Sequence, residues 1–125
     1  MEFLPDVLNE KCGSRSVLNH VTSRWGGLVM IALMDGTLRF SALRRRIGGV
    51  SERMLTQSLR LLEDDGMIER IAHQVVPPHV DYRLTPMGAE VARIVLDLAQ
   101  CIEANLESIA RFRNSRAEAR SGDGS

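Results

Sequence analysis

The chain has 125 residues, of which 44% are hydrophobic and 26% charged, and its 16 basic and 16 acidic residues give a formal net charge of zero. This composition argues against wholesale disorder and, at this length, against several domains, so we expect one domain with one core. No apolar run approaches the roughly 18 residues of a membrane-spanning helix and no signal core follows the start, so we expect a cytoplasmic protein without a membrane partner.

The N-terminal third predicts an arm and two helices. Residues 1–13 have no hydrophobic period and are expected to form an N-terminal arm. Ser14 is a candidate N-cap for a short helix with apolar residues at helical spacing. Residues 25–34, "WGGLVMIALM", are apolar almost all round, which predicts a buried helix that ends at the turn signal Asp35-Gly36.

Residues 41–65 predict two helices joined by a short turn. The segment "SALRRRI" predicts a brief helix that ends at Gly48-Gly49, and Ser51 is a good N-cap for the next helix, which Gly66 ends. At helical spacing one face of that second helix carries Leu55, Ser58, Leu59 and Leu62, and the other carries Arg53, Thr56, Gln57 and Arg60. A short glycine-containing turn before a polar, basic helix is typical of a helix-turn-helix.

The C-terminal half predicts a hairpin followed by a long helix. Residues 67–84 contain two strand-like segments joined by "VPPH", so they predict a β-hairpin. Thr85-Pro86 starts a helix expected to run to about residue 114, and residues 115–125 are expected to be a flexible tail. The order of elements over residues 14–114 predicts a mainly helical α+β fold, a winged helix-turn-helix with a long C-terminal dimerisation helix.

The charges are unevenly distributed along this neutral chain. Six arginines lie between residues 39 and 60, where Glu52 is the only acidic residue. A basic patch of this kind on a neutral chain indicates a surface for an anionic partner, whereas evenly mixed charges would indicate ordinary solvated surface.

Two segments, "LRFSALRRRIGGVSERMLTQSLRLLEDDGMIER" and "VPPHVDYRLTPMGAEV", closely resemble the HxlR-type family of bacterial transcriptional regulators. The resemblance covers roughly residues 12–100, and Cys12 stands thirteen positions before Trp25, as the family's N-terminal cysteine does before its tryptophan. It implies a regulator without a cofactor, which we expect to be a repressor that binds double-stranded DNA at an inverted-repeat operator as a homodimer. Glu52 departs from the family pattern, which often has proline there, and places an acid near the expected DNA.

The resemblance places the second helix of the helix-turn-helix in the major groove. Arg53 and Arg60 suit phosphate or guanine, and Gln57 suits adenine. The first helix of the motif is expected to contribute one or two phosphate contacts, and the hairpin a further contact. The residues expected to touch DNA are Arg44, Arg45, Ser51, Arg53, Thr56, Gln57, Arg60 and His79. The alternative is a solvated face, or a winged helix that binds a protein partner instead of DNA.

The long last helix carries more apolar surface than a small core can cover, which favours pairing with a second copy. The family dimerises through its first and last helices. The residues expected at a dimer contact are Val17, Val95, Leu98, Ile102, Ile109 and Phe112. The alternative is that this stripe folds onto its own chain, as its first half near Val91 is expected to do.

Cys12 suggests a thiol switch, because some HxlR-type regulators sense oxidants or electrophiles through the cysteine at this position. Two alternatives stay open: an idle structural cysteine, and a regulator that responds to a small ligand without thiol chemistry. Cys101 lies on the apolar side of the last predicted helix, and we expect it to be buried in the core.

The sequence shows no catalytic motif, so we do not expect an enzyme. His20, His73 and His79 match no metal-ligand spacing, and no metal site is expected.

Overall fold

The computed structural model describes residues 6–123, so the first five residues of the expected arm lie outside it. In chain order the elements are α1 (Gly13–Val21), α2 (Gly26–Ala32), the 3-10 helix η1 (Leu33–Asp35), β1 (Leu38–Arg39), α3 (Phe40–Arg46), α4 (Glu52–Asp64), β2 (Ile68–His73), β3 (His79–Leu84), α5 (Pro86–Ala104) and α6 (Leu106–Asp123). The chain divides into two compact units between Val95 and Leu96. No helix of the described residues is both long and apolar enough to cross a membrane.

The core of the first unit is built from the helices that precede the sheet. Val29 and Met30 of α2 are fully buried, which confirms the prediction of a buried helix over residues 25–34. They share one cluster with Leu43 of α3 and with Leu55 and Leu62 of α4. The predicted helix-turn-helix, α3 and α4, is therefore fixed to the rest of the fold by side chains removed from water.

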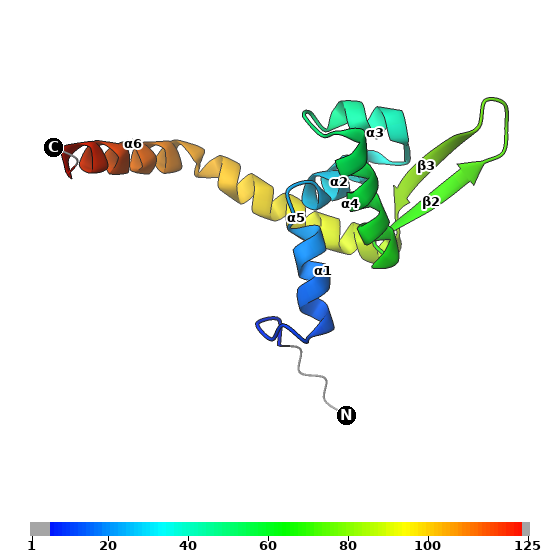
Figure 1. Ribbon diagram of the computed structural model, residues 1–125, viewed down its shortest axis with the longest axis horizontal. Helices are drawn as coiled ribbons and strands as arrows, with labels where there is room; N and C mark the ends of the chain where they lie inside the picture. Colours follow the sequence, from blue (N-terminus) through cyan, green and yellow to red (C-terminus); the bar gives the residue numbers. More distant parts are fainter. Residues whose placement is uncertain (1–5, 124–125) are drawn as a thin grey trace. The chain divides into compact units, whose positions relative to one another are not determined.

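The predicted hairpin is present and belongs to a three-stranded antiparallel sheet with the order β1-β3-β2. We call the hairpin of β2 and β3 the wing (Figure 1). Gly66, whose φ of 75° suits glycine, ends α4 and turns the chain into β2, as its place in the sequence predicted. The register pairs Ile68 with Leu84 at the base of the wing and His73 with His79 at its outer end.

Hydrogen bonds of Thr85 hold the start of α5 next to the end of α4. The Thr85 hydroxyl donates to the carbonyl of Gly66 at 2.6 Å and accepts a hydrogen bond from the N–H of Gly88 at 2.9 Å. This confirms Thr85-Pro86 as a helix start. A Cβ atom at Gly88 would overlap the carbonyl of Met67, so the closeness of the two segments depends on glycine.

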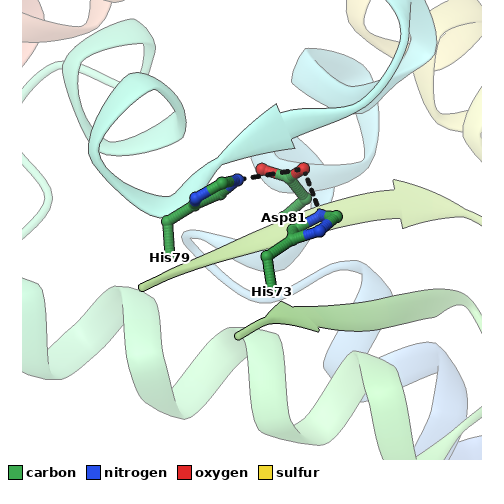
Figure 2. Close-up of side chains that lie close together, drawn as sticks. All are labelled: His73, His79 and Asp81. Carbon is green, nitrogen blue, oxygen red and sulfur yellow. Dashed lines mark hydrogen bonds and ion pairs between the residues drawn. The ribbon is translucent and has the colours of Figure 1, made fainter. Parts of the chain in front are cut away.

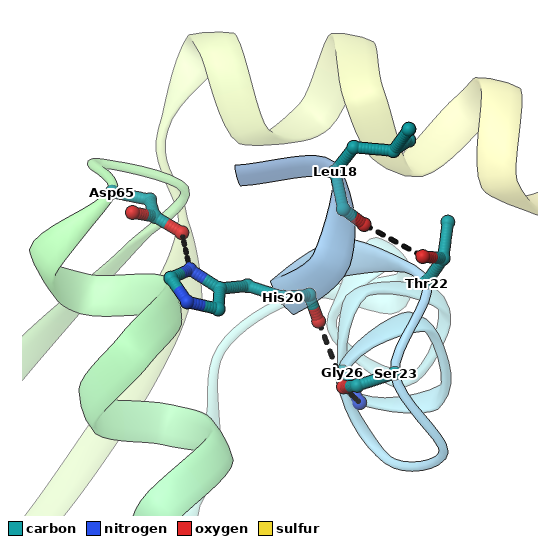
Figure 3. A network of polar contacts seen from close by, with 6 residues as sticks. All are labelled: Leu18, His20, Thr22, Ser23, Gly26 and Asp65. Atoms are coloured by element: carbon teal, nitrogen blue, oxygen red, sulfur yellow. Dashed lines mark hydrogen bonds and ion pairs between the residues drawn. The ribbon is translucent and has the colours of Figure 1, made fainter. Parts of the chain in front are cut away.

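A polar contact joins the ends of α1 and α4 (Figure 3). Nδ1 of His20 lies 2.6 Å from a carboxylate oxygen of Asp65, the residue that follows α4. Beside this pair, Ser23 Oγ donates to the carbonyl of His20 and accepts from the N–H of Gly26. The turn between α1 and α2 is thereby held close to the helix-turn-helix.

Three details of the helices differ from the sequence prediction. Helix α1 begins at Gly13 with Cys12 as its N-cap, so Ser14, expected to be the cap, lies inside the first turn. The expected single C-terminal helix is two helices that meet at Asn105. The Asn105 side-chain amide donates to the carbonyl of Cys101 at 2.8 Å, and the Asn105 backbone N–H turns to Ile102 instead. The segment from residue 115, expected to be a tail, continues α6 as far as Asp123.

The contact between Gly88 and Met67 predicts that Gly88→Ala lowers the free energy of unfolding by about 1–3 kcal/mol, the usual cost of overpacking. Urea unfolding at fixed protein concentration measures this. Gly13→Ala is the matched control, because no atom lies within 4 Å of the added methyl group, and it should stay within about 0.5 kcal/mol of wild type. Equal stability of the two variants would contradict this account of the α4–α5 junction.

Candidate nucleic-acid interface

Helix α4 has two faces, as its sequence predicted. Leu55, Leu59 and Leu62 are at most 2% exposed, and on the opposite side the four polar residues Arg53, Thr56, Gln57 and Arg60 are all exposed. The helix starts at Ser51, whose side-chain oxygen accepts a hydrogen bond from the N–H of Met54 at 3.1 Å. We call the four exposed residues the α4 face. It is stabilised in position because the leucines behind it are buried.

A cavity of ≈ 510 Å³ lies between α4 and the sheet, next to the α4 face. Thr56 and Arg60 line it from the helix, and Arg70 of β2 lines it from the wing. Arg70 lies in the predicted hairpin but was not among the residues expected to touch DNA. The guanidinium groups of Arg60, from α4, and Arg70, from the wing, therefore line the same cavity.

Two acidic residues of α4, Glu52 and Glu63, also line this cavity, and Glu52 lies at the start of the helix. It lies in the first turn of α4 and lines the cavity beside Thr56 and Arg60. A carboxylate near the N-terminus of a helix is favoured by the helix dipole. The same carboxylate repels phosphate, so it restricts how a nucleic-acid backbone can approach the start of α4.

The two hydroxyl groups expected to touch DNA already have partners within the helix. Ser51 caps α4, and Thr56 Oγ1 donates to the carbonyl of Glu52 at 2.8 Å. The oxygen of each side chain stays exposed at the surface as a potential acceptor, and the Ser51 hydroxyl proton stays free to donate. Ser51 can therefore donate to an anion without giving up its cap, whereas Thr56 would first have to release the carbonyl of Glu52.

The three arginines of α3 have different surroundings. Arg46 forms an exposed ion pair with Asp35 at 2.8 Å, and Arg44 Nε donates to the carbonyl of Val50 at 3.4 Å. Arg45 is exposed, and no hydrogen bond or ion pair within residues 6–123 engages it. Arg45 is therefore the α3 side chain that is most available to an outside anion, and the expected pair Arg44 and Arg45 lies on the exposed side of the helix.

His79, expected to be a DNA contact of the wing, is held inside the hairpin. Its ring stacks on that of His73 with centroids 4.5 Å apart, and its Nε2 lies 3.8 Å from the carboxylate of Asp81. Beyond it, the loop of residues 74–78 carries Val76, which is 99% exposed. His73 and Asp81 were not singled out together in the sequence. The signal was present in the hairpin register, which places residues 73 and 79 opposite each other.

The residues expected at a dimer contact fall into two groups. Val17 of α1 and Val95 of α5 pack against the core of their own chain, and for Val95 this is the alternative considered for the last helix. Leu98, Ile102 and Phe112 are between 50% and 69% exposed, and Ile109 is half-buried. Cys101 is exposed as well, so the expectation that it lies in the core was wrong, because nothing in the described part of the chain covers this stretch of α5.

Cys12 lies at the start of α1, with its sulfur 3.0 Å from the hydroxyl oxygen of Ser14. The Ser14 side chain, followed by backbone hydrogen bonds at Ser14, Asp6 and Arg15, holds the pKa of the Cys12 thiol below its ordinary value. A thiol with a lowered pKa is more thiolate at neutral pH and reacts faster with electrophiles. The lowered pKa is one of the features that a reactive cysteine requires.

Comparisons with known proteins match this arrangement. A family model described as HxlR-like helix-turn-helix matches residues 20–110. The HTH-type transcriptional regulator YtfH of Escherichia coli (strain K12) is 59% identical over 112 residues, which cover 90% of this chain and 89% of that protein. The solved structure of a transcriptional regulator ytfH from Salmonella typhimurium has a TM-score of 0.84 at 54% identity and covers 89% of this chain and 99% of its own. The redox regulator HypR in its reduced form has a TM-score of 0.72 at 34% identity, over 78% of this chain and 97% of its own.

The contact between Ser14 and Cys12 predicts that Ser14→Ala slows alkylation of Cys12 by iodoacetamide at neutral pH. Loss of the hydroxyl raises the pKa of the thiol, so the pH at which the rate reaches half its maximum moves upward. The rate is followed by mass spectrometry in a Cys101→Ser background, so that Cys12 is the reacting thiol. Ser16→Ala, an exposed serine of the same helix, is the control. Identical pH–rate curves for the two variants would remove the role given to Ser14.

Proposed function

Because this chain belongs to the HxlR-like helix-turn-helix family of transcriptional regulators, we propose that it recognises an inverted-repeat DNA operator as a homodimer. The observation that carries the proposal is the α4 face: exposed Arg53, Thr56, Gln57 and Arg60 behind which buried leucines fix the helix. In a helix-turn-helix the second helix lies in the major groove, and α4 is that helix.

The chemistry of the α4 face suits both parts of DNA recognition. Arg53 and Arg60 can each form two hydrogen bonds to the O6 and N7 atoms of guanine, and Gln57 can do the same with adenine. We propose that Arg45 of α3 and Arg70 of β2 meet the phosphate backbone, because both are exposed and Arg70 lines the cavity next to the α4 face. Phosphate contacts position the protein, and the side chains of α4 supply the contacts that distinguish bases. The four residues of the α4 face are charged or polar, whereas a protein-binding surface usually carries apolar anchors; the exposed Met54 lies beside them on the helix.

The exposed apolar stripe supports the homodimer. Leu98, Ile102, Leu106 and Phe112, which follow Val95 along α5 and α6, are each at least half exposed. Pairing with a second copy removes these side chains from water. This burial stabilises the dimer by roughly 25 cal/mol for each Å² of apolar surface. A symmetric dimer presents two α4 helices, which is what an inverted repeat requires. A dimer seated where the repeat overlaps a promoter obstructs transcription, so we propose repression.

A second proposal concerns the signal. Cys12 has a lowered pKa and lies at the N-terminal end of α1, one of the two elements that the family resemblance places at the dimer contact. HypR, 34% identical to this chain, is described as a redox regulator. We propose that oxidants or electrophiles modify Cys12 and thereby change the affinity for DNA. Comparing wild type with Cys12→Ser for release of DNA by diamide separates this proposal from control by a small ligand.

The α4 face predicts that Arg53→Ala and Arg60→Ala weaken binding to a DNA fragment that the wild-type protein selects from genomic DNA. Loss of an arginine that contacts one phosphate reduces the magnitude of the slope of log affinity against log salt concentration by about 0.9. An arginine that reads a base costs about 1–3 kcal/mol and relaxes specificity at that base. Fluorescence anisotropy at several salt concentrations measures both quantities.

Arg93→Ala is the matched control, because it removes the same charge from an exposed position of α5. We expect this variant to bind DNA with nearly the affinity of the wild type, apart from a small decrease caused by the loss of one positive charge. Correctly folded Arg53→Ala and Arg60→Ala proteins with the affinity and salt slope of Arg93→Ala would show that the α4 face does not touch DNA.

A further inference from the structure

The outer end of the wing gathers three side chains that can bind a metal ion (Figure 2). His73 is the last residue of β2, and His79, its cross-strand partner, is the first residue of β3. Asp81 follows two residues after His79, and since side chains alternate along a strand it lies on the same face of the sheet. The antiparallel register therefore brings together residues that no linear metal-binding spacing would identify.

The imidazole rings of His73 and His79 both approach one carboxylate oxygen of Asp81. Nε2 of His73 lies 2.9 Å and Nε2 of His79 lies 3.8 Å from Oδ2 of Asp81, and all three potential ligand atoms lie within 4.8 Å of one another. The side chains are 38%, 29% and 23% exposed, respectively, so an ion from solvent can reach them. The stacked imidazole rings already point the same nitrogen of each ring to the shared oxygen.

We propose that His73, His79 and Asp81 form a binding site for a divalent transition-metal ion of the Zn²⁺ class. Nε2 of each histidine and one oxygen of the carboxylate are the protein ligands, and water completes the coordination. Bonds of about 2 Å place tetrahedral ligand atoms about 3.3 Å apart, a spacing that lies between the two distances to Asp81. Small rotations of the side chains are enough to close the site around an ion.

The ligand types select the metal. Two neutral imidazoles and one carboxylate suit Zn²⁺, Co²⁺, Ni²⁺ and Cu²⁺, which accept nitrogen ligands. Mg²⁺ and Ca²⁺ require shells of oxygen ligands, and this cluster offers a single carboxylate. The site is therefore expected to discriminate strongly between these two classes of divalent ion.

Metal binding changes both the bonding and the charge of the wing. When the ion binds, His73 Nε2 exchanges its hydrogen bond to Asp81 Oδ2 for a bond to the metal, and the neutral ring carries its one proton on Nδ1. Two strand ends next to the loop of residues 74–78 become joined through the ion, and a cluster with one negative side chain acquires a net positive charge. A cationic, ordered wing end meets phosphate more favourably than an acidic one. The site itself does not depend on the proposed DNA contact.

The test is titration of the tag-free full chain with Zn²⁺, followed by calorimetry and by competition with a coloured chelator. Wild type should bind about one Zn²⁺ per chain, with no comparable binding of Mg²⁺ at the same concentration. His73→Gln, His79→Gln and Asp81→Asn should each weaken Zn²⁺ binding by about tenfold or more, since even residues that only support metal ligands cost 10–100-fold. A Cys12→Ser/Cys101→Ser protein, titrated alongside, should bind as wild type does, because the thiols are not ligands.

His20→Gln is the matched control, because it removes the chain's other histidine–aspartate pair outside the wing. It should retain the affinity of the wild type for Zn²⁺. Amide spectra of the ¹⁵N-labelled protein locate the ion independently, with Zn²⁺-dependent shifts expected in residues 68–84. Absence of Zn²⁺ binding at about 100 µM, or binding that the three wing substitutions leave unchanged, would overturn the proposal and leave the cluster as a hydrogen-bonded feature of the hairpin.

Discussion

Burial of the leucine face of α4 is the constraint on which the rest of this structure depends. Leu55 and Leu62 are fully buried with α2 and α3, and Gly66 then turns the chain into the wing. At 100° per residue, a helix fixed along this stripe must present Arg53, Thr56, Gln57 and Arg60 to solvent. The same helix end is tied to α1 through Asp65 and His20 and to α5 through Thr85. One buried stripe thus determines both the position of the helix-turn-helix and the direction in which its polar face points.

The surface that results is more mixed than its arginine content suggests. Arg46 is neutralised by Asp35, Glu52 stands at the start of α4, and His79 is held beside Asp81. The positive charge available to a DNA backbone is therefore concentrated on Arg45, Arg53, Arg60 and Arg70. A chain of zero net charge gains little from long-range attraction to DNA, so the recognition that we propose rests on short-range contacts of these side chains.

The features predicted from sequence are those with local causes. The Ser51 cap, the Gly66 stop, the Thr85-Pro86 start and the two faces of α4 each follow from residues within a few positions of one another. Features that depend on long-range register or on competing hydrogen bonds were missed. The histidine and aspartate cluster depends on which residues face each other in the wing, and the break at Asn105 depends on a side chain that replaces a backbone donor. Cys101 was placed in the core because an apolar stripe says which residues share a face but not whether anything covers it.

The central claim is that two copies of the α4 face read DNA together. The most direct measurement is footprinting of the purified protein with hydroxyl radicals and dimethyl sulfate on fragments that it selects from genomic DNA. The account predicts two protected half-sites related by a dyad, with centres about one helical turn of ~10 base pairs, or a multiple of it, apart and with guanines protected in the major groove. Failure to enrich any sequence above background, or protection without two-fold symmetry, would contradict it.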